Sequence, residues 1–244
     1  MDAIATIRVN GPMRSLLVPA PVGRRSAQLV VGLVLYTLSM ALLVHADLGN
    51  MPWDVLSQGI ARRTGASFGT VTLAISVLVL VCWIPLRQRP GVGTVANVLV
   101  IGFLVDPLLD LLDRLPEVPW VARGAMAVVG IVMNAVATGL YVGTLLGPGP
   151  RDGLMTGLVR RTGKPVAMVR TTIEVLVVSF GWALGGRLGV ATVVYALAVG
   201  PLVHLVLARL TIAPPTVDPG PDGPGVRDVP AMRPDASRYC SSPG

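Results

Sequence analysis

The sequence predicts an all-α integral membrane protein with six transmembrane helices. The helices are expected to form two inverted three-helix repeats, each with a short amphipathic or re-entrant helix. Long apolar runs, basic residues at the ends of those runs and a polar segment that occurs twice predict this class. Apolar residues make up 52% of the 244-residue chain and charged residues 14%, whereas soluble domains carry roughly 25% charged residues.

Six apolar runs have the length of a transmembrane helix, which needs roughly 17–25 residues. Strands of a membrane barrel would alternate apolar and polar residues with a period of two, and these runs do not alternate. The runs are therefore expected to be helices. The six expected spans are Ala27–Ala46, Ser67–Leu86, Val92–Leu112, Val121–Leu146, Val166–Leu184 and Gly189–Leu210.

Basic residues predict the orientation of these spans. Four arginines precede the first span, and the loop between the fourth and fifth spans carries three arginines and the single lysine. An excess of basic residues marks the cytoplasmic side. We therefore expect a multi-pass protein of the bacterial cell inner membrane with both termini in the cytoplasm. The net charge of +7 follows from this topology, so the expected partners are membrane lipids and no nucleic acid.

The spans divide the chain into five parts. Residues 1–26 are a cytoplasmic N-terminal segment, residues 27–112 the first three-span repeat, residues 113–120 a connecting loop and residues 121–210 the second three-span repeat. The last part, residues 211–244, is rich in proline and glycine and has few large apolar residues. Such a composition cannot bury a core, so this tail is expected to be disordered.

A polar segment among the apolar runs occurs twice. "LGNMPWDVLSQGIARRTG" (48–65) and "LGPGPRDGLMTGLVRRTG" (146–163) share ten of eighteen residues at an offset of 98. Ordinary residue frequencies would give about one or two matches. The same offset aligns the beginnings of the third and sixth spans. Because each repeat has three spans, the two repeats should have opposite orientations in the membrane, as in many transporters.

Each copy of the polar segment predicts a short helix between the first two spans of its repeat. Pro52 suits the first turn of a helix, and Asp54 in that turn interacts favourably with the helix dipole. The helix either lies in the membrane interface or enters the membrane as a re-entrant segment. Its polar face carries Asp54, Gln58 and Arg62 in the first copy and Asp152, Thr156 and Arg160 in the second.

Several polar residues lie within the expected spans. Asp106 aligns with His204, and ionisable groups in a bilayer are costly enough to suggest a function, here a proton relay; the alternative is a water-facing position near a span end. Arg170 and Glu174 are one helical turn apart, which predicts a structural ion pair. Asn97 and Asn134 are expected to form hydrogen bonds between helices.

No motif predicts an enzyme. The sequence has no H-E-x-x-H, no G-x-S-x-G and no phosphate-binding glycine-rich loop. The two cysteines, Cys82 and Cys240, suit neither a metal site nor a disulfide. We therefore expect no catalytic residues, no metal and no cofactor.

The run "LGNMPWDVLSQGIARRTGASFGT" and the later run "RPGVGTVANVLVIGFLVD" resemble the YczE/YitT-like family of small bacterial membrane proteins. The resemblance covers most of residues 27–210 and implies a polytopic bacterial membrane protein, with no substrate. In the second half, Arg151 replaces Trp53, so any site should be asymmetric. The residues that carry the resemblance are Gly49, Pro52, Trp53, Asp54, Gly91, Gly93, Thr94, Asn97 and Gly102.

The leading functional hypothesis is a small-molecule transporter or permease with its site at the interface of the two repeats. The alternative is a non-transporting accessory or scaffold protein that acts on a membrane partner. The sequence leaves the substrate open and does not decide between a homodimer and a complex with another membrane protein. The candidate substrate-binding residues are Asp54, Trp53, Asp152, Arg62, Arg160, Asn97, Asp106 and His204.

Overall fold

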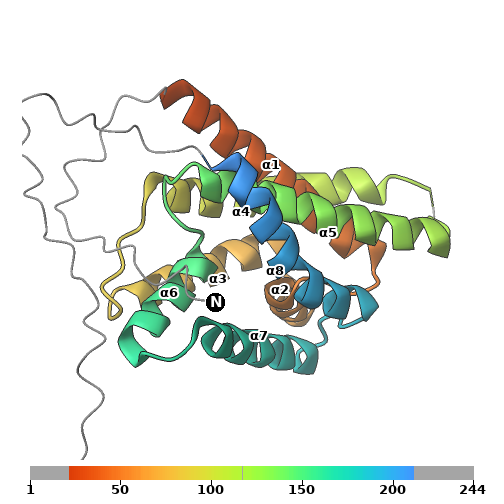
Figure 1. Ribbon diagram of the computed structural model, residues 1–244. Helices are drawn as coiled ribbons and strands as arrows, with labels where there is room; N and C mark the ends of the chain where they lie inside the picture. The colour runs from red at the N-terminus through yellow and green to blue at the C-terminus, as the bar shows by residue number, and fades with distance from the viewer. Residues whose placement is uncertain (1–21, 117, 212–244) are drawn as a thin grey trace, which may run out of the picture. The chain divides into compact units, whose positions relative to one another are not determined.

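The computed structural model describes residues 22–116 and 118–211. These residues form eight α-helices and no strand, which confirms the predicted all-α class (Figure 1). The expected disordered tail lies outside the described residues except for Thr211, and so does most of the expected N-terminal segment. The helices are α1 (Val22–Ala46), α2 (Pro52–Thr64), α3 (Phe68–Trp83), α4 (Val92–Asp113), α5 (Trp120–Gly143), α6 (Pro150–Thr162), α7 (Val166–Ala183) and α8 (Val190–Leu210).

Five helices, α1, α4, α5, α7 and α8, are long and apolar enough to cross a membrane. A sixth span exists if α2 and α3, which meet at an angle of 119°, are counted together. The expected second span, Ser67–Leu86, is shorter than predicted, because α3 ends at Trp83. Pro85 follows closely, and because proline has no N–H it cannot make the next helical hydrogen bond.

The predicted repeat is visible in the helix positions. The helices α5, α6, α7 and α8 each begin 98 residues after their counterparts α1, α2, α3 and α4. The two expected short helices are α2 and α6, each 13 residues long. Gly65 and Gly163 end them in the left-handed conformation that glycine adopts at low cost.

The packing of the helices is reciprocal between the two halves. Within each half, α1 packs on α4 and α5 packs on α8, while α1 and α5 pack on each other (Figure 1). Between the halves, α2 packs on α7 and α6 packs on α3. Each short helix therefore packs on the third helix of the opposite half. Reciprocal contacts of this kind are what a two-fold relationship produces, while the opposite orientation of the halves across a membrane stays a prediction.

Two main-chain hydrogen bonds join the halves in the same reciprocal way. Gly93 N donates to Leu146 O over 2.9 Å, and Ala191 N donates to Leu48 O over 3.0 Å. At the offset of 98 residues, Gly93 corresponds to Ala191 and Leu48 corresponds to Leu146, so the two bonds are repeat equivalents. We refer to these two bonds as the seam.

Glycines make the close approach at the seam possible. A Cβ atom on Gly91 would collide with Leu146 O, and one on Gly189 would collide with Leu48 O. The facing glycines, Gly49 and Gly147, have φ of 117° and 131°, values that residues with a side chain rarely adopt. The glycines of the duplicated segment therefore have a structural role.

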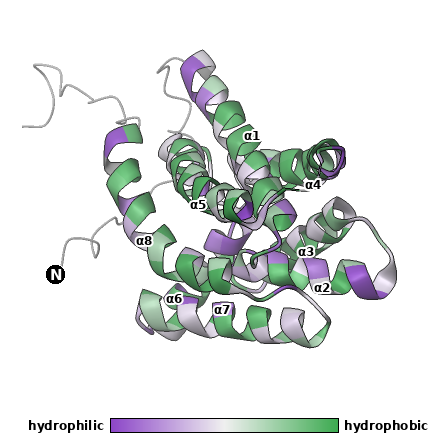
Figure 2. Ribbon diagram, turned by 90° about the vertical axis from the view of Figure 1, so that its right-hand side faces the viewer, coloured by the Kyte–Doolittle hydropathy of each residue, from purple (hydrophilic) through white to green (hydrophobic). Residues whose placement is uncertain are grey.

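Large apolar side chains cover the outward faces of several helices. Phe103 of α4, Phe180 of α7 and Leu197 of α8 are all more than 60% exposed, and hydrophobic residues dominate these helices (Figure 2). A soluble monomer rarely exposes so much apolar surface. Lipid tails are as apolar as these side chains, so the surface fits a multi-pass membrane protein.

Candidate functional site

A cavity of about 400 Å³ lies between the two halves, within the size range of small-molecule sites. Six helices contribute to its walls: α1, α2, α5, α6, α7 and α8. We call it the large cavity. Its aromatic and charged residues are Tyr36, Trp53, Tyr141, Tyr195, Arg151, Asp152, Arg170 and Glu174.

The two short helices both begin at the large cavity. Pro52 and Pro150 occupy their first turns, where the missing N–H of proline costs nothing. The next residues, Trp53 and Arg151, are equivalent in the repeat and meet each other. The Arg151 guanidinium carbon lies 5.4 Å from the centroid of the Trp53 ring, a cation–π distance.

Asp54 is the most deeply buried acid of this region, with a fully buried side chain. Arg151 Nη2 donates to Asp54 Oδ1 over 3.1 Å. The other carboxylate oxygen, Asp54 Oδ2, is buried and has no hydrogen-bond partner among the described residues. A buried carboxylate is tolerated only when it is paired, so Arg151 is required for Asp54 to be ionised here.

Asp152, the repeat equivalent of Asp54, has a different partner. The Tyr141 hydroxyl donates to Asp152 Oδ2 over 2.9 Å. In the part of the chain that the structure describes, Asp152 forms no ion pair. Its carboxylate therefore faces the large cavity without a cation of its own.

Two further polar groups belong to the same cavity wall. Arg170 Nε donates to Glu174 Oε1 over 2.9 Å, which confirms the predicted ion pair, and both residues line the cavity. Tyr195 OH donates to Asn134 Oδ1 over 2.8 Å, and Asn134 Nδ2 donates to Ser39 Oγ over 3.0 Å. The expectation that Asn134 bonds between helices is thus confirmed, and the bond fixes the position of Tyr195.

A second cavity, of about 50 Å³, is related to the first by the repeat. We call it the small cavity. Tyr36, Tyr141, Arg151 and Asp152 line both cavities and form a polar layer shared by them. Each of the other residues of the small cavity has a repeat equivalent in the wall of the large cavity, which extends further. In the small cavity they include Thr72, Ser76, Asn97 and Ile101, and in the large cavity Arg170, Glu174, Tyr195 and Val199.

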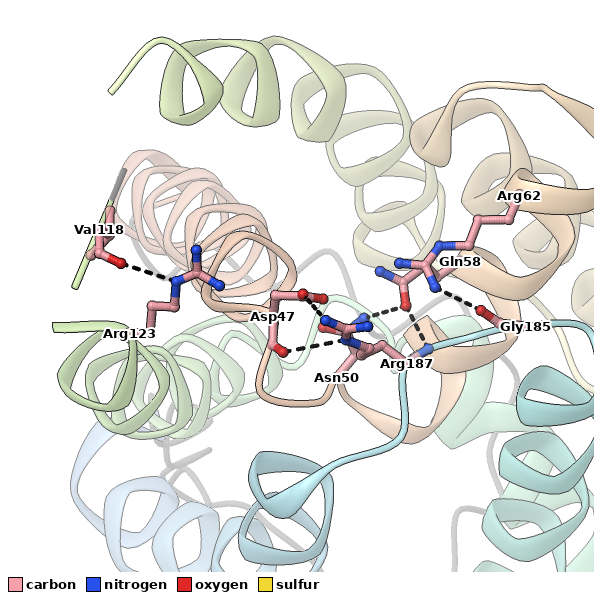
Figure 3. A network of polar contacts seen from close by, with 8 residues as sticks. All are labelled: Asp47, Asn50, Gln58, Arg62, Val118, Arg123, Gly185 and Arg187. Atoms are coloured by element: carbon pink, nitrogen blue, oxygen red, sulfur yellow. Dashed lines mark hydrogen bonds and ion pairs between the residues drawn. The ribbon is translucent and has the colours of Figure 1, made fainter. Parts of the chain in front are cut away.

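A network of polar contacts ties the segment before α2 to the loop between α7 and α8 (Figure 3). The Arg187 side chain forms an ion pair with Asp47. Gln58 Oε1 accepts from Arg187 N over 2.7 Å and from Asn50 Nδ2 over 3.1 Å. We call these four residues the end network. Its equivalent in the other half is lost, because Leu145, Pro148 and Thr156 replace Asp47, Asn50 and Gln58.

Half of the predicted site residues lie at the cavities. Trp53 lines the large cavity, Asn97 the small one and Asp152 both, while Asp54 bonds to the cavity residue Arg151. Six further cavity residues were not among the predicted site residues: Arg151, Tyr36, Tyr141, Tyr195, Arg170 and Glu174. The sequence did contain a signal for these residues, because most of them differ in chemistry from their repeat equivalents.

The other four predicted site residues lie outside both cavities. Arg62 Nη1 donates to Gly185 O over 2.7 Å (Figure 3), and Arg160 is exposed near the end of α6. Asp106 Oδ1 accepts from Gly69 N over 2.7 Å, so it satisfies a free N–H in the first turn of α3. His204 is exposed on α8.

The part of the chain that is similar to known proteins is the part that forms the helices. The model of a family of unknown function (DUF6198) matches residues 23–208, which include nearly all of the eight helices. The chain belongs to the DUF6198 family. No solved structure matches this DUF6198 protein.

Three relatives are similar over most of their length. An uncharacterized protein of Haemophilus influenzae (strain ATCC 51907 / DSM 11121 / KW20 / Rd) is 35% identical over 192 residues, which cover 75% of this chain and 87% of the relative. The uncharacterized membrane protein YczE of Bacillus subtilis (strain 168) is 28% identical over 182 residues, 73% of this chain and 83% of the relative. The uncharacterized protein YyaS of the same strain is 22% identical over 177 residues, 72% and 88% of the two chains. The resemblance to the YczE-like family of bacterial membrane proteins is confirmed.

Proposed function

We propose that this DUF6198 protein is a small-molecule transporter or permease of the bacterial inner membrane, with its binding site in the large cavity. Both termini are placed in the cytoplasm, as the arginine distribution favours. The observation that carries the proposal is the pair of repeat-equivalent cavities that share one polar layer. The proposal involves no catalytic step and no cofactor.

Paired cavities support transport because of the predicted inversion of the repeats. If the halves have opposite orientations, equivalent cavities open toward opposite faces of the membrane. A solute bound beside the shared layer would then reach the other face when the large cavity closes and the small one opens. Rocking of one half against the other around a fixed site is how inverted-repeat transporters alternate access.

The end network supports an assignment of the membrane face toward which the large cavity opens. In the predicted topology it lies on the outer face, where the Asp47–Arg187 pair and the Gln58 bonds hold the halves together. Among the described residues, the cytoplasmic face has no equivalent of the Asp47–Arg187 pair or of the Gln58 bonds. The large cavity includes Pro148 and Thr156 from the equivalent positions. The described conformation therefore corresponds to an inward-open state in this proposal.

Cysteine accessibility in native membranes tests the proposal without a known substrate. In a background with Cys82→Ser and Cys240→Ser, we would compare Glu174→Cys with its repeat equivalent Ser76→Cys. A membrane-impermeant thiol reagent should label Glu174→Cys from the cytoplasmic side and Ser76→Cys from the outer side. A matched control is Val77→Cys, whose exposed apolar position should face lipid and resist the reagent from both sides.

The labelling pattern can contradict transport. If Glu174→Cys and Ser76→Cys react from the same side, or if Ser76→Cys never reacts in a protein of normal abundance, access does not alternate. The accessory or scaffold protein would then be the better hypothesis, and co-purification with a membrane partner would be the next measurement.

A further inference from the structure

The charged side chains at the large cavity are paired except for one. Arg151 pairs with Asp54, and Arg170 pairs with Glu174. Asp152 lines both cavities and has only the neutral Tyr141 hydroxyl as a bonded partner among the described residues. The two arginines thus face three carboxylates, so the site has a net charge of −1 when all five groups are ionised.

The walls around this charge are aromatic. Tyr36, Tyr141, Tyr195 and Trp53 all line the cavity, and the rings of Tyr36 and Tyr141 meet edge to face with centroids 6.0 Å apart. Aromatic faces attract cations, and aromatic cages recognise organic ammonium groups. Trp53 already holds the Arg151 guanidinium, which leaves the tyrosines nearest Asp152 for a ligand.

We infer that the solute of the large cavity is a small organic cation, whose positively charged nitrogen group lies against Asp152 among the tyrosine rings. The inference rests on the proposed function and names the substrate class of that site. The nitrogen would supply the cation that Asp152 lacks, and the rings would contact its alkyl or aryl substituents. A cavity of about 400 Å³ is near the lower end of the range for small-molecule sites, so the solute is small.

An anionic solute is disfavoured by the same contacts. The beginnings of α2 and α6 would favour an anion if they were free, but each carries an aspartate in its first turn that already occupies the positive end of the helix. The arginine charges are likewise taken by Asp54 and Glu174. An anion would therefore lie beside the unpaired Asp152, and like charges at close range are repulsive.

Thermal unfolding of the detergent-purified full-length protein tests the inference with solutes matched in shape. We would titrate choline, its neutral isostere 3,3-dimethyl-1-butanol and the anion 3,3-dimethylbutanoate at equal ionic strength. Benzylammonium, benzyl alcohol and benzoate form a second series, and sodium chloride serves as the inorganic cation. One or both organic cations should raise Tm with a saturable dependence on concentration, because a ligand that binds only the native state stabilises it.

Variants assign the effect to Asp152. Asp152→Asn should weaken the cation-dependent rise in Tm at least tenfold, and Asp152→Glu should retain part of it. Asp113→Asn makes the same charge change at a carboxylate that is 70% exposed and outside both cavities, so it should leave the rise unchanged. If Asp152→Asn does not fold, protection of Thr156→Cys in the cavity wall from a thiol reagent supplies a second measurement.

Several outcomes would overturn the inference. They are an equal or larger Tm rise with the neutral or anionic member of a series, an equal rise with sodium, and no rise or cysteine protection with either organic cation. A rise that persists in Asp152→Asn would remove Asp152 from the site. None of these results decides the proposed function, because the labelling of Glu174→Cys and Ser76→Cys tests alternating access without a ligand.

Discussion

The large and small cavities occupy equivalent places in the two repeats, yet their volumes are about 400 Å³ and about 50 Å³. From the sizes of the side chains in their walls, the large cavity would be expected to be the smaller of the two. The large cavity is lined by Arg170, Glu174 and Tyr195, and the small one by the smaller equivalents Thr72, Ser76 and Asn97. The difference must therefore come from the positions of the helices.

Helix packing explains the difference. In the first half α3 packs along α4, and Leu73 lies against Gly102. In the second half the equivalent helices α7 and α8 make almost no contact with each other, and the large cavity occupies the space between them. One repeat is therefore closed and the other open, although both contain the same four helices.

The largest effect is expected from locking the closed repeat. In the cysteine-free background, Leu73→Cys/Gly102→Cys should form a disulfide, because Leu73 Cβ lies 3.1 Å from the position of a Cβ on Gly102, near the separation that a disulfide needs. Oxidation should abolish alternation, measured as complete loss of solute flux into proteoliposomes. Reduction should restore the flux.

The equivalent pair in the open repeat is the matched control. A Cβ on Gly200 would have no atom within 4 Å, so Thr171→Cys/Gly200→Cys should not cross-link in the described conformation. It should cross-link only when the second repeat closes, and a solute that favours the open cavity should slow the reaction. Rapid cross-linking of both pairs under identical conditions would contradict the assignment of one open and one closed repeat.

The next largest effect concerns the ion pair in the shared layer. Arg151→Met leaves Asp54 buried without a partner, and removing one member of a buried pair typically costs about 3–5 kcal/mol. A large decrease in Tm of the purified protein is expected. Adding Asp54→Asn should recover much of the loss, whereas Arg160→Met at an exposed position of the same helix should have little effect. A full decrease in the double variant would show that Arg151 contributes through packing and not through charge.

A smaller effect is expected at the seam. Gly189→Ala places a Cβ against Leu48 O, and overpacking of this kind costs about 1–3 kcal/mol. Gly91→Ala should behave in the same way if the halves are truly reciprocal. Gly124→Ala, where a Cβ meets no atom within 4 Å, should be neutral or slightly stabilising. The free energies of unfolding of the three variants, from denaturant titration in mixed micelles, provide the comparison.

The smallest effect on stability is expected at the end network. The Asp47–Arg187 pair is partly exposed, with 28% and 50% of the side chains accessible, and such pairs contribute about 0.2–1 kcal/mol. Arg187→Gln should therefore barely change Tm. It should nevertheless increase outer labelling of Ser76→Cys, because it weakens the closed face. An unchanged labelling rate would exclude the network as a gate.

The sequence predicted the helices well because their signals are local. Apolar run length marked the spans, and proline and glycine marked the beginnings and ends of α2 and α6. The duplicated segment identified the repeat, and in the structure the four helices of the second half begin at the same offset from those of the first. The length of α3 was overestimated, because an apolar run continues past the point where Pro85 disfavours the helix.

The site was predicted only in part because it depends on packing between the halves. Arg151 differs from Trp53 in the alignment, but only the reciprocal packing shows that the two side chains stack on each other. Asp106 appeared to be an unpaired carboxylate within a span, and its partner, Gly69 N, belongs to a different helix. The sequence shows that an ionisable group within a span is energetically costly. It does not show which neighbouring group forms the hydrogen bond that lowers this cost.

The seam between the halves uses only main-chain atoms. The N–H of Gly93 and Ala191 and the carbonyls of Leu146 and Leu48 are present whatever side chain those four positions carry, and only the facing glycines restrict the choice of residue. After a gene duplication, the two halves would remain in register while the residues around them diverged. One copy could therefore acquire Arg151, Arg170 and Glu174 while the other has the neutral residues Trp53, Thr72 and Ser76, and a symmetric ancestor could become an asymmetric protein without refolding.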